Sequence, residues 1–569
     1  MTQAIRKTAP EPLEPVPFHI PQAIETTLDN GLRVIVFEDK RLPLVSYRLA
    51  FLSGDINDPA DGTGLTSALA AMMTEGTLNY SSHELAEKIE RLGASLSANS
   101  SDDFTVVAAS ALSLYRTEIL ELMAEVVFRP TFPESELDLY RRNTIENLKF
   151  QRSQPGFLAN EQTARLIYGE HPYATVSPAA ADVAKITRDS LREFHARTLV
   201  PNNAILVAVG DIDRDEFMQE LNDKFVHWQR GEVAAGDFAS LPQRSGRTLT
   251  IVDRPGSAQS NIVVANLAID RRHPDYFSVL VMNQILGAGA SSRVFMNLRE
   301  EKGYTYGAYT RIDAKKLAGD FEATAEVRTS VTGDSLKEFF YELERIRTET
   351  ADEQELADAK NFLTGVFPIR AETQEGMTSM IVNQQLYGLP SDYLQTYRDN
   401  INAVTLDDVL AVAKRYVRPD EAAIVIVGDA EDVLKQAREF ASQISVFDTE
   451  GNPVAAEKYA QADNEERADV SGKWSVSLDF QGQSVPVTMT IEQTGGEFTG
   501  VLETMLGSGK IDGGRVSGSK LKANSIVDIQ GQNVEFTIAA TIDGDSISGE
   551  LNAPIVPKPL TFAGARETS

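Results

Sequence analysis

Arg299 and Tyr306 are the residues whose types and spacing are best suited to chemistry. They lie seven positions apart in the segment SSRVFMNLREEKGYTYGAY (residues 291–309), and Gly303 between them allows the chain to turn from a helix into a strand. An arginine presents a fixed fork of donors to a carbonyl or carboxylate, and a tyrosine hydroxyl can donate to a developing oxyanion. The pair could therefore hold a polar group at a reacting centre. Alternatively, Arg299 is a surface ion-pair partner of a neighbouring glutamate and Tyr306 is a half-buried strand aromatic.

Metal-binding side chains are scarce in the sequence. There is no cysteine, which excludes disulfides, thiolate nucleophiles and cysteine-ligated metals. No two of the histidines are three or four residues apart, the spacing that places two imidazoles on one helix face. The histidines are His19, His83, His171, His195, His227 and His273. We therefore expect no metal site in this chain.

Charge and hydropathy exclude further classes of function. The formal net charge is −29 and no basic stripe offsets it, so we expect no binding to nucleic acid or to an anionic membrane surface. No apolar run approaches the ~18–20 residues that cross a bilayer, so no membrane span is expected. Residues 1–21 form a leader punctuated by prolines, without the apolar core of a signal peptide. The expected chain is soluble, and either cytoplasmic as written or periplasmic if a signal peptide was removed before Met1.

An internal repeat indicates how the structural elements are organised. Thr187–Asp211 and Thr405–Asp429 align without gaps. Each begins with a threonine and an early acidic residue, as helix N-termini do, and continues through a proline to an apolar strand closed by Gly-Asp. The chain therefore contains two homologous halves, at residues 22–228 and 247–447, joined by a polar linker at 229–246.

Both halves mix long helical stretches with strands, which predicts an α+β fold in which helices pack on an antiparallel sheet. A charged, alanine-rich linker follows at residues 448–470. Residues 471–569 alternate apolar and polar side chains between glycine turn signals, and this pattern predicts an all-β barrel or sandwich. It contains no cluster of titratable residues, so we interpret it as an accessory domain.

The segment GLTSALAAMMTEGT (residues 64–77) resembles the active-site helix of the insulinase/pitrilysin family of zinc peptidases, whose working form is close to G-L-A-H-F-L-E-H-M-x-F-K-G-T. Residues 291–309 resemble a signature of the second half of the same family, close to S-R-L-x-x-x-L-R-E-x-x-G-x-x-Y. The resemblance covers residues 22 to 447, with the final hundred residues outside it.

This resemblance implies that the zinc motif is degenerate here. Ser67 and Ala71 occupy the positions of the two histidine ligands, and Ala70 occupies that of the glutamate that activates the zinc-bound water. The family's third ligand, a downstream glutamate on another helix, corresponds to Asn147, with Glu146 beside it. An alanine can neither bind a metal nor move a proton. We therefore expect no catalytic residue, no bound cofactor and no activity of this chain alone.

The resemblance also implies that Arg299 and Tyr306 contact the substrate backbone near the scissile bond. In some members, among them bacterial heterodimers and proteins like the mitochondrial processing peptidase, one subunit carries H-x-x-E-H and zinc and the other carries the Arg–Tyr pair. The hypothesis is thus a substrate-binding, non-zinc-binding subunit of a heterodimeric zinc metalloendopeptidase that hydrolyses peptides in an enclosed chamber. Peptide would add a strand to a sheet edge, although the small polar residues at 94–101 indicate that the first half does not provide that edge.

Two alternatives stay open. One is a catalytically inert scaffold or peptide-binding protein with the same fold, as in the core subunits of a respiratory complex that the family resembles. The other is an autonomous protease with a rebuilt site, which would need zinc ligands recruited from distant histidines.

Overall fold

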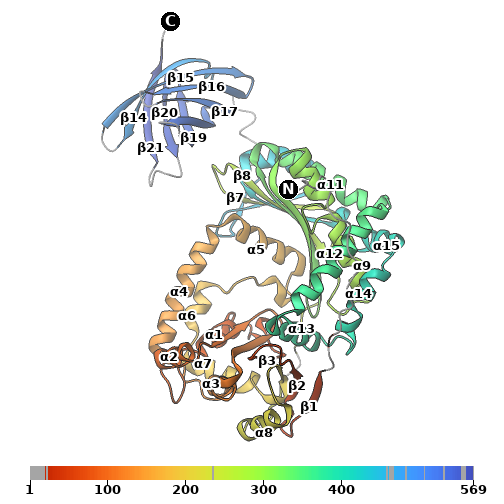
Figure 1. Cartoon of the computed structure of the whole chain (residues 1–569). Coiled ribbons are helices and arrows are strands. Elements are labelled where there is room, and N and C mark those ends of the chain that lie inside the picture. The colour runs from red at the N-terminus through yellow and green to blue at the C-terminus, as the bar shows by residue number, and fades with distance from the viewer. Residues whose placement is uncertain are drawn as a thin grey trace, which may run out of the picture.

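The computed structural model describes residues 20, 23–233, 236, 238–456, 459, 467–480, 483–504, 507–529, 532–552 and 559–567. These residues form two α+β halves and a C-terminal barrel, which confirms the predicted fold class (Figure 1). The predicted leader lies outside the described residues except for Ile20, and so does part of the linker predicted at 448–470. Within the described part of the chain, no helix has the length and apolar character needed to cross a membrane.

The first half is a mixed sheet with helices. Its strands lie in the order β1 (Ile24–Thr27), β2 (Arg33–Glu38), β6 (Ala204–Gly210), β3 (Leu44–Phe51), β5 (Thr105–Leu112) and β4 (Ser95–Ser100). Its helices are α1 (Leu65–Met72), α2 (Ser82–Arg91), α3 (Arg116–Phe128), α4 (Glu134–Arg152), α5 (Pro155–Tyr168), α6 (Ala180–Lys185), α7 (Arg188–Thr198) and α8 (Arg214–Phe225). The sequence predicted an antiparallel sheet, but the observed sheet is mixed, because β6 lies parallel to β2. A long helical segment separates β5 from β6, so β6 can enter the sheet in either direction.

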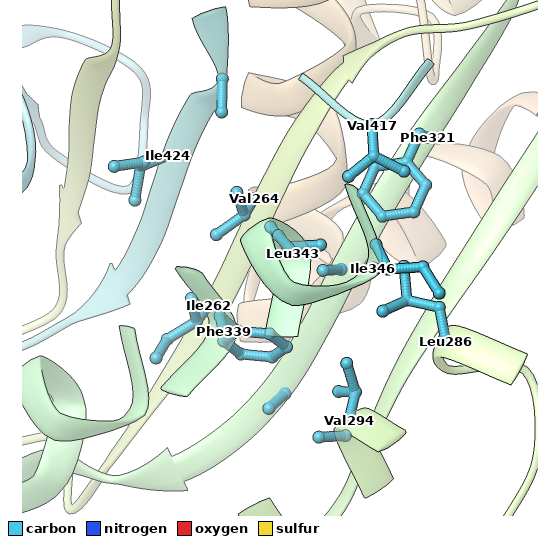
Figure 2. Close-up of a cluster of buried hydrophobic side chains, with 14 of the residues drawn as sticks. Ile262, Val264, Leu286, Val294, Phe321, Phe339, Leu343, Ile346, Val417 and Ile424 are labelled. Atoms are coloured by element: carbon cyan, nitrogen blue, oxygen red, sulfur yellow. The ribbon is translucent and has the colours of Figure 1, made fainter. Parts of the chain in front are cut away.

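The second half repeats this plan. Its strands lie in the order β13 (Pro453–Val454), β12 (Gln443–Phe447), β7 (Thr248–Asp253), β11 (Ala423–Gly428), β8 (Gln259–Leu267), β10 (Gly319–Arg328) and β9 (Thr305–Ala314), with β7 parallel to both β11 and β12. Its helices are α9 (Tyr276–Leu286), α10 (Arg293–Phe295), α11 (Thr332–Thr348), α12 (Glu353–Ala371), α13 (Gln374–Leu386), α14 (Tyr393–Ala403), α15 (Leu406–Tyr416) and α16 (Ala430–Ala437). Figure 2 shows part of its core, where Phe339 and Leu343 of α11 meet Ile262 and Val264 of β8.

The internal repeat has the same local structure in both halves. Thr187 caps α7 by accepting a hydrogen bond from the backbone N–H of Ser190 (3.1 Å). Thr405 caps α15 in the same way through the N–H of Asp408 (3.1 Å). A short proline turn then leads to β6 or β11, and both strands are fully buried within their sheets. The predicted homology of the halves therefore extends to their caps and central strands.

The two halves exchange helices. The helix α13, from the second half, packs against β3 and β6 of the first sheet. Its residue Glu375 accepts a hydrogen bond from the buried Arg48 of β3 (2.8 Å). Conversely α5, from the first half, packs against β8 and β11 of the second sheet. Packing thus crosses the boundaries predicted at residues 228 and 247, and the halves share their cores (Figure 1).

The C-terminal domain is a closed antiparallel barrel rather than a sandwich. Its strands follow chain order as β14 (Gly472–Phe480), β15 (Gln483–Thr494), β16 (Glu497–Thr504), β17 (Gly507–Ser517), β18 (Lys520–Ile529), β19 (Gln532–Asp543), β20 (Ser546–Asn552) and β21 (Leu560–Arg566). Side chains fill the interior, including Trp474, whose indole N–H donates to the carbonyl of Val470 (2.9 Å). The barrel lies beside the end of the second half where β7 and β8 meet (Figure 1).

Candidate functional site

The helix α1 carries the degenerate zinc positions and is held at its N-terminus by Asp58. The Asp58 carboxylate accepts hydrogen bonds from the backbone N–H of Gly64 (2.6 Å) and from that of Thr66 (2.8 Å). Gly64 has a φ of +89°, and a Cβ there would lie 2.8 Å from Pro178, so a larger residue would strain this turn. The loop before α1 therefore fixes where residues 67, 70 and 71 lie.

Ser67 belongs to a hydrogen-bond network in place of a metal site. Its hydroxyl lies 2.9 Å from that of Ser100 on β4 and donates to Asp55 (3.3 Å), which also accepts from Ser100 (2.9 Å). Burial raises the pKa of Asp55 to about 6, although the hydrogen bond from Ser100 opposes the shift. This network links α1 to the edge strand of the first sheet.

The remaining zinc positions carry no ligands. Ala70 is 2% exposed and packed into the core, and Ala71 is half-buried. Asn147 lies on the exposed side of α4 beside Glu146, which pairs with Lys149 (2.7 Å). The donors at these positions do not fit zinc, which needs imidazole, carboxylate or thiolate ligands. Among the residues that the structure describes, no group of three histidine, aspartate or glutamate side chains could hold a metal ion.

Arg299 is positioned by an unusual helical turn. The short helix α10 continues as η5 (Met296–Glu301), a π-helical turn in which the N–H of Lys302 donates to the carbonyl of Asn297 (3.0 Å). Such turns are rare and often mark functional sites. Gly303 then ends the helix with a φ of +63°, and its N–H donates to the carbonyl of Arg299 (3.1 Å). This is the helix-to-strand turn expected from the sequence.

The Arg299 side chain is partly exposed. Its Nε lies 3.4 Å from a carboxylate oxygen of Glu300, and its guanidinium carbon lies 4.8 Å from the centre of the Phe295 ring. The contact with Glu300 matches the ion pair that the sequence left as an alternative. It is a solvent-exposed contact at long range, so it leaves most of the guanidinium donors available.

Tyr306 is the more informative of the two residues. It lies at the start of β9, and 90% of its surface is exposed. It is therefore not the half-buried strand aromatic that the sequence allowed as an alternative. β9 is the last strand of its sheet, so its outer edge adjoins no other strand in the described sheet order. The phenol is accessible to a ligand, whereas the edge of β9 is partly covered, because the N–H of Thr310 donates to the carbonyl of Gly287 (2.9 Å).

Arg299 and Tyr306 line one cavity of about 940 Å³. The β7–β8 turn and the end of β10 form further parts of its wall, and the barrel closes the opposite side. A separate cavity of about 650 Å³ lies at α1 and is lined by Ser67 and the carboxylates of Asp55, Asp58 and Asp102. The structure thus brings Arg299 and Tyr306 together but keeps both apart from the degenerate zinc positions.

Comparison with known proteins identifies the family to which the segment around α1 and the segment around Arg299 belong. Residues 33–174 match the family model described as insulinase (peptidase family M16), and residues 185–363 match that described as the peptidase M16 inactive domain. Together the two matches span more than half of the chain. The chain belongs to peptidase family M16. It carries serine and alanine at residues 67 and 71, which the motif assigns to zinc ligands, and alanine at residue 70, which the motif assigns to the water-activating glutamate. Neither match reaches the C-terminal barrel.

Relatives in family M16 carry different descriptions. A Bacillus subtilis protein named an uncharacterized zinc protease, YmxG, is 22% identical over 404 residues, covering 70% of this chain and 97% of the relative. A Helicobacter pylori protein named a non-peptidase homolog is 23% identical over 398 residues, covering 70% of this chain and 91% of the relative. The solved peptidase M16 inactive domain from Pseudomonas fluorescens superposes with a TM-score of 0.67 at 28% identity, covering 71% of this chain and 98% of that structure.

Sequence reasoning missed two features of this M16 chain. The first is Asp55, whose half-buried carboxyl joins Ser67 to Ser100. The acidic loop before α1 was a visible signal, but a loop carboxylate is ordinarily exposed and nothing in the sequence marks this one as half-buried. The second is the barrel, which the sequence assigned to an accessory role and which the structure places against the Arg299–Tyr306 cavity.

Proposed function

We propose that this chain is the substrate-binding, non-zinc-binding subunit of a heterodimeric zinc metalloendopeptidase. The observation that carries the proposal is a contrast within one molecule. Small side chains that cannot bind zinc occupy the zinc positions on α1, while Arg299 and the 90% exposed Tyr306 line a common cavity. The chain thus keeps the groups that bind a substrate and lacks the groups that hydrolyse it.

The geometry around β9 suits an extended peptide. A peptide can add as a further strand to the outer edge of a last strand. The edge of β9 is already bonded to Gly287 at Thr310, so the peptide would add on the Tyr306 side of that residue. A guanidinium can then hold a peptide carbonyl, and a phenol can donate to an oxyanion as it develops. Main-chain recognition of this kind gives broad rather than residue-specific selection, as expected for a peptidase that works in an enclosed chamber.

The missing metal must come from elsewhere for hydrolysis to occur. Arg299 and Tyr306 line a different cavity from Ser67, so a zinc helix on a second polypeptide would be needed opposite them. A homologous subunit that carries H-x-x-E-H would supply that helix and its zinc. The description of the H. pylori relative as a non-peptidase homolog supports a division of labour of this kind.

Peptide hydrolysis by this chain, by its H-x-x-E-H homologue and by their mixture tests the proposal. We expect activity to require the mixture. Arg299→Ala and Tyr306→Phe should each lower kcat by roughly 10²-fold while both subunits still co-elute in gel filtration, because the lost groups act on the transition state. Arg192→Ala, which removes an exposed arginine of α7 with only a weak contact at 4.0 Å, is the matched control and should be silent.

Each other outcome has a definite meaning. Full activity of the Arg299→Ala mixture would show that the pair has no catalytic role. Activity of the single chain would reveal a metal site that this proposal excludes. Absence of hydrolysis in every mixture would favour the inert scaffold.

A further inference from the structure

Ion pairs attach the barrel to the second half at the Arg299–Tyr306 cavity, and a third, longer contact joins Lys522 to Glu431 (3.8 Å) beside the two described next. Arg515 of β17 lies 2.8 Å from the Asp432 carboxylate, and Lys522 of β18 lies 2.6 Å from that of Asp429. Arg515 and Lys522 are direct partners in the β17–β18 register, so both side chains project from the same patch of the outer barrel surface. The barrel therefore meets the second half in a defined orientation.

The acceptors on the second half are fixed in place. Asp429 follows β11 and caps α16 by accepting from the N–H of Glu431 (3.2 Å); it also accepts from the N–H of Gly256 (2.7 Å). Its side chain is only 4% exposed, so it cannot move to follow the barrel. Burial would lower the pKa of Lys522, but the Asp429 carboxylate outweighs burial and raises it. Lys522 thus stays charged against a rigid anchor.

The barrel also brings polar side chains to the cavity. Asn524 lies two residues after Lys522 on β18 and therefore on the same outer face. Thr537 of β19 lies directly opposite Asn524 in the register. Both line the cavity that Arg299 and Tyr306 line from the other side. An amide and a hydroxyl thus face the arginine and the tyrosine.

The charges around the cavity are largely matched within the protein. Lys522 and Arg515 pair with the anchoring aspartates, and Arg299 has a contact with Glu300. No large excess of one sign is left to select a charged side chain. The amide of Asn524 can donate and accept, and the hydroxyl of Thr537 can do the same. This combination suits the alternating N–H and C=O groups of a polypeptide backbone.

We infer that the barrel forms the outer wall of the peptide site, with Asn524 and Thr537 in contact with the main chain of a peptide held by Arg299 and Tyr306. This inference rests on the proposed function and deepens it, because it assigns a binding role to a domain outside both matched family segments. The barrel then contributes to affinity through its docked position, which Arg515 and Lys522 maintain.

The test uses the full chain and two readouts. The first readout is barrel position. The native sequence has no cysteine, so spin labels at Thr350→Cys and Ser546→Cys, both at exposed positions, report the distance between the second half and the barrel. The second readout is affinity for an Ala–Ser peptide with blocked termini and a neutral nitrobenzoxadiazole fluorophore, measured by anisotropy. An uncharged probe prevents the charge changes below from acting on the peptide directly.

Different variants separate the effect of displacing the barrel from the effect of removing its contacts with the peptide. Arg515→Asp should broaden the distance distribution and weaken peptide binding about tenfold, and adding Asp432→Arg should reverse both effects by restoring the pair in the opposite sense. Asn524→Ala with Thr537→Ala should weaken binding about tenfold without changing the distance, since these changes remove hydrogen bonds alone. Lys510→Glu alters an exposed β17 lysine outside the cavity lining and is the matched control for charge.

The inference and the proposed function fail differently. Unchanged peptide affinity in both the Arg515→Asp and the Asn524→Ala/Thr537→Ala variants would overturn the role of the barrel, while a loss of affinity in Arg299→Ala would leave the proposed function intact. A parent chain that does not bind the peptide at all would overturn both. An equal effect of Lys510→Glu would show that the charge of the barrel, and not its docking, controls binding.

Discussion

Replacing Asp320 with asparagine tests how α5 of the first half is held on the second sheet. Asp320 of β10 is 3% exposed, and one of its carboxylate oxygens accepts from the hydroxyl of Tyr168 on α5 (2.6 Å). Its other oxygen, Oδ1, has no hydrogen-bond partner. Burial, followed by the negative charge of Glu322, raises the pKa of Asp320 from 3.8 to about 7. An ionised Asp320 is therefore a source of instability between the two halves.

The magnitude follows from this shift. A difference of about three pKa units corresponds to about 4 kcal/mol at a pH above both values. Between about pH 4 and about pH 7 the folded chain retains a proton that the unfolded chain has released, so stability falls as the pH rises through this window and is level above it. Asparagine keeps an acceptor for Tyr168 but leaves a buried amide nitrogen without a partner, at a cost of about 1–3 kcal/mol. We expect a net gain of about 2 kcal/mol at about pH 8 and a net loss of about 2 kcal/mol at about pH 4, where Asp320 is protonated and only the cost of the buried amide is left.

Denaturant titrations followed by hydrogen exchange of peptides from β8 and β10 would measure this effect locally, which avoids treating a chain of several domains as one unfolding unit. Asp313→Asn is the control. Asp313 lies opposite Asp320 in the β9–β10 register, but 40% of its side chain is exposed, so solvent screens its charge. A gain of equal size at both pH values, or an equal gain in the control, would refute the argument from a buried charge.

Two further predictions concern stability. Ala70→Glu should destabilise the chain by about 2–4 kcal/mol, because it buries a charge at a site that is 2% exposed, whereas Ala71→Glu on the half-buried side of α1 should cost much less. Thermal melts of the two variants would check this, and equal losses of stability would contradict the packing described for α1. Thr187→Ala and Thr405→Ala each remove an equivalent cap and should each cost about 1 kcal/mol by the same measurement, and clearly unequal effects would show that the repeat does not extend to helix energetics.

The sequence predicted the fold where a local pattern determines it. The repeat at Thr187 and Thr405 specified a capped helix and a buried strand in each half, because the cap and the apolar run are encoded within about twenty residues. The exchange of α5 and α13 between halves could not be predicted in this way. Their buried faces would be satisfied by either sheet, and only tertiary contacts such as Arg48–Glu375 and Tyr168–Asp320 select the partner.

The candidate site shows the same limit. Arg299 and Tyr306 follow from a short motif, and the turn at Gly303 between them was predicted correctly from its residue type. The position of the barrel was not predictable, because Asp429 resembles any aspartate that caps a helix. That it also anchors Lys522 depends on a contact between residues 93 positions apart, which no local pattern contains.

The degenerate zinc positions on α1 and Tyr306 on β9 differ in how they are packed. This difference favours a binding role for the chain over a purely structural one. At α1 the side chains are engaged within the protein: Ala70 is packed and Ser67 bonds with Asp55 and Ser100, although a cavity lies beside them. At β9 the strand edge is engaged at Thr310, whose N–H donates to the carbonyl of Gly287 (2.9 Å), but the side chain of Tyr306 is left open. A tyrosine that is 90% exposed gains little packing energy, so a purely structural role does not account for it. An open phenol that lines a cavity is instead suited to contact with a ligand such as a peptide.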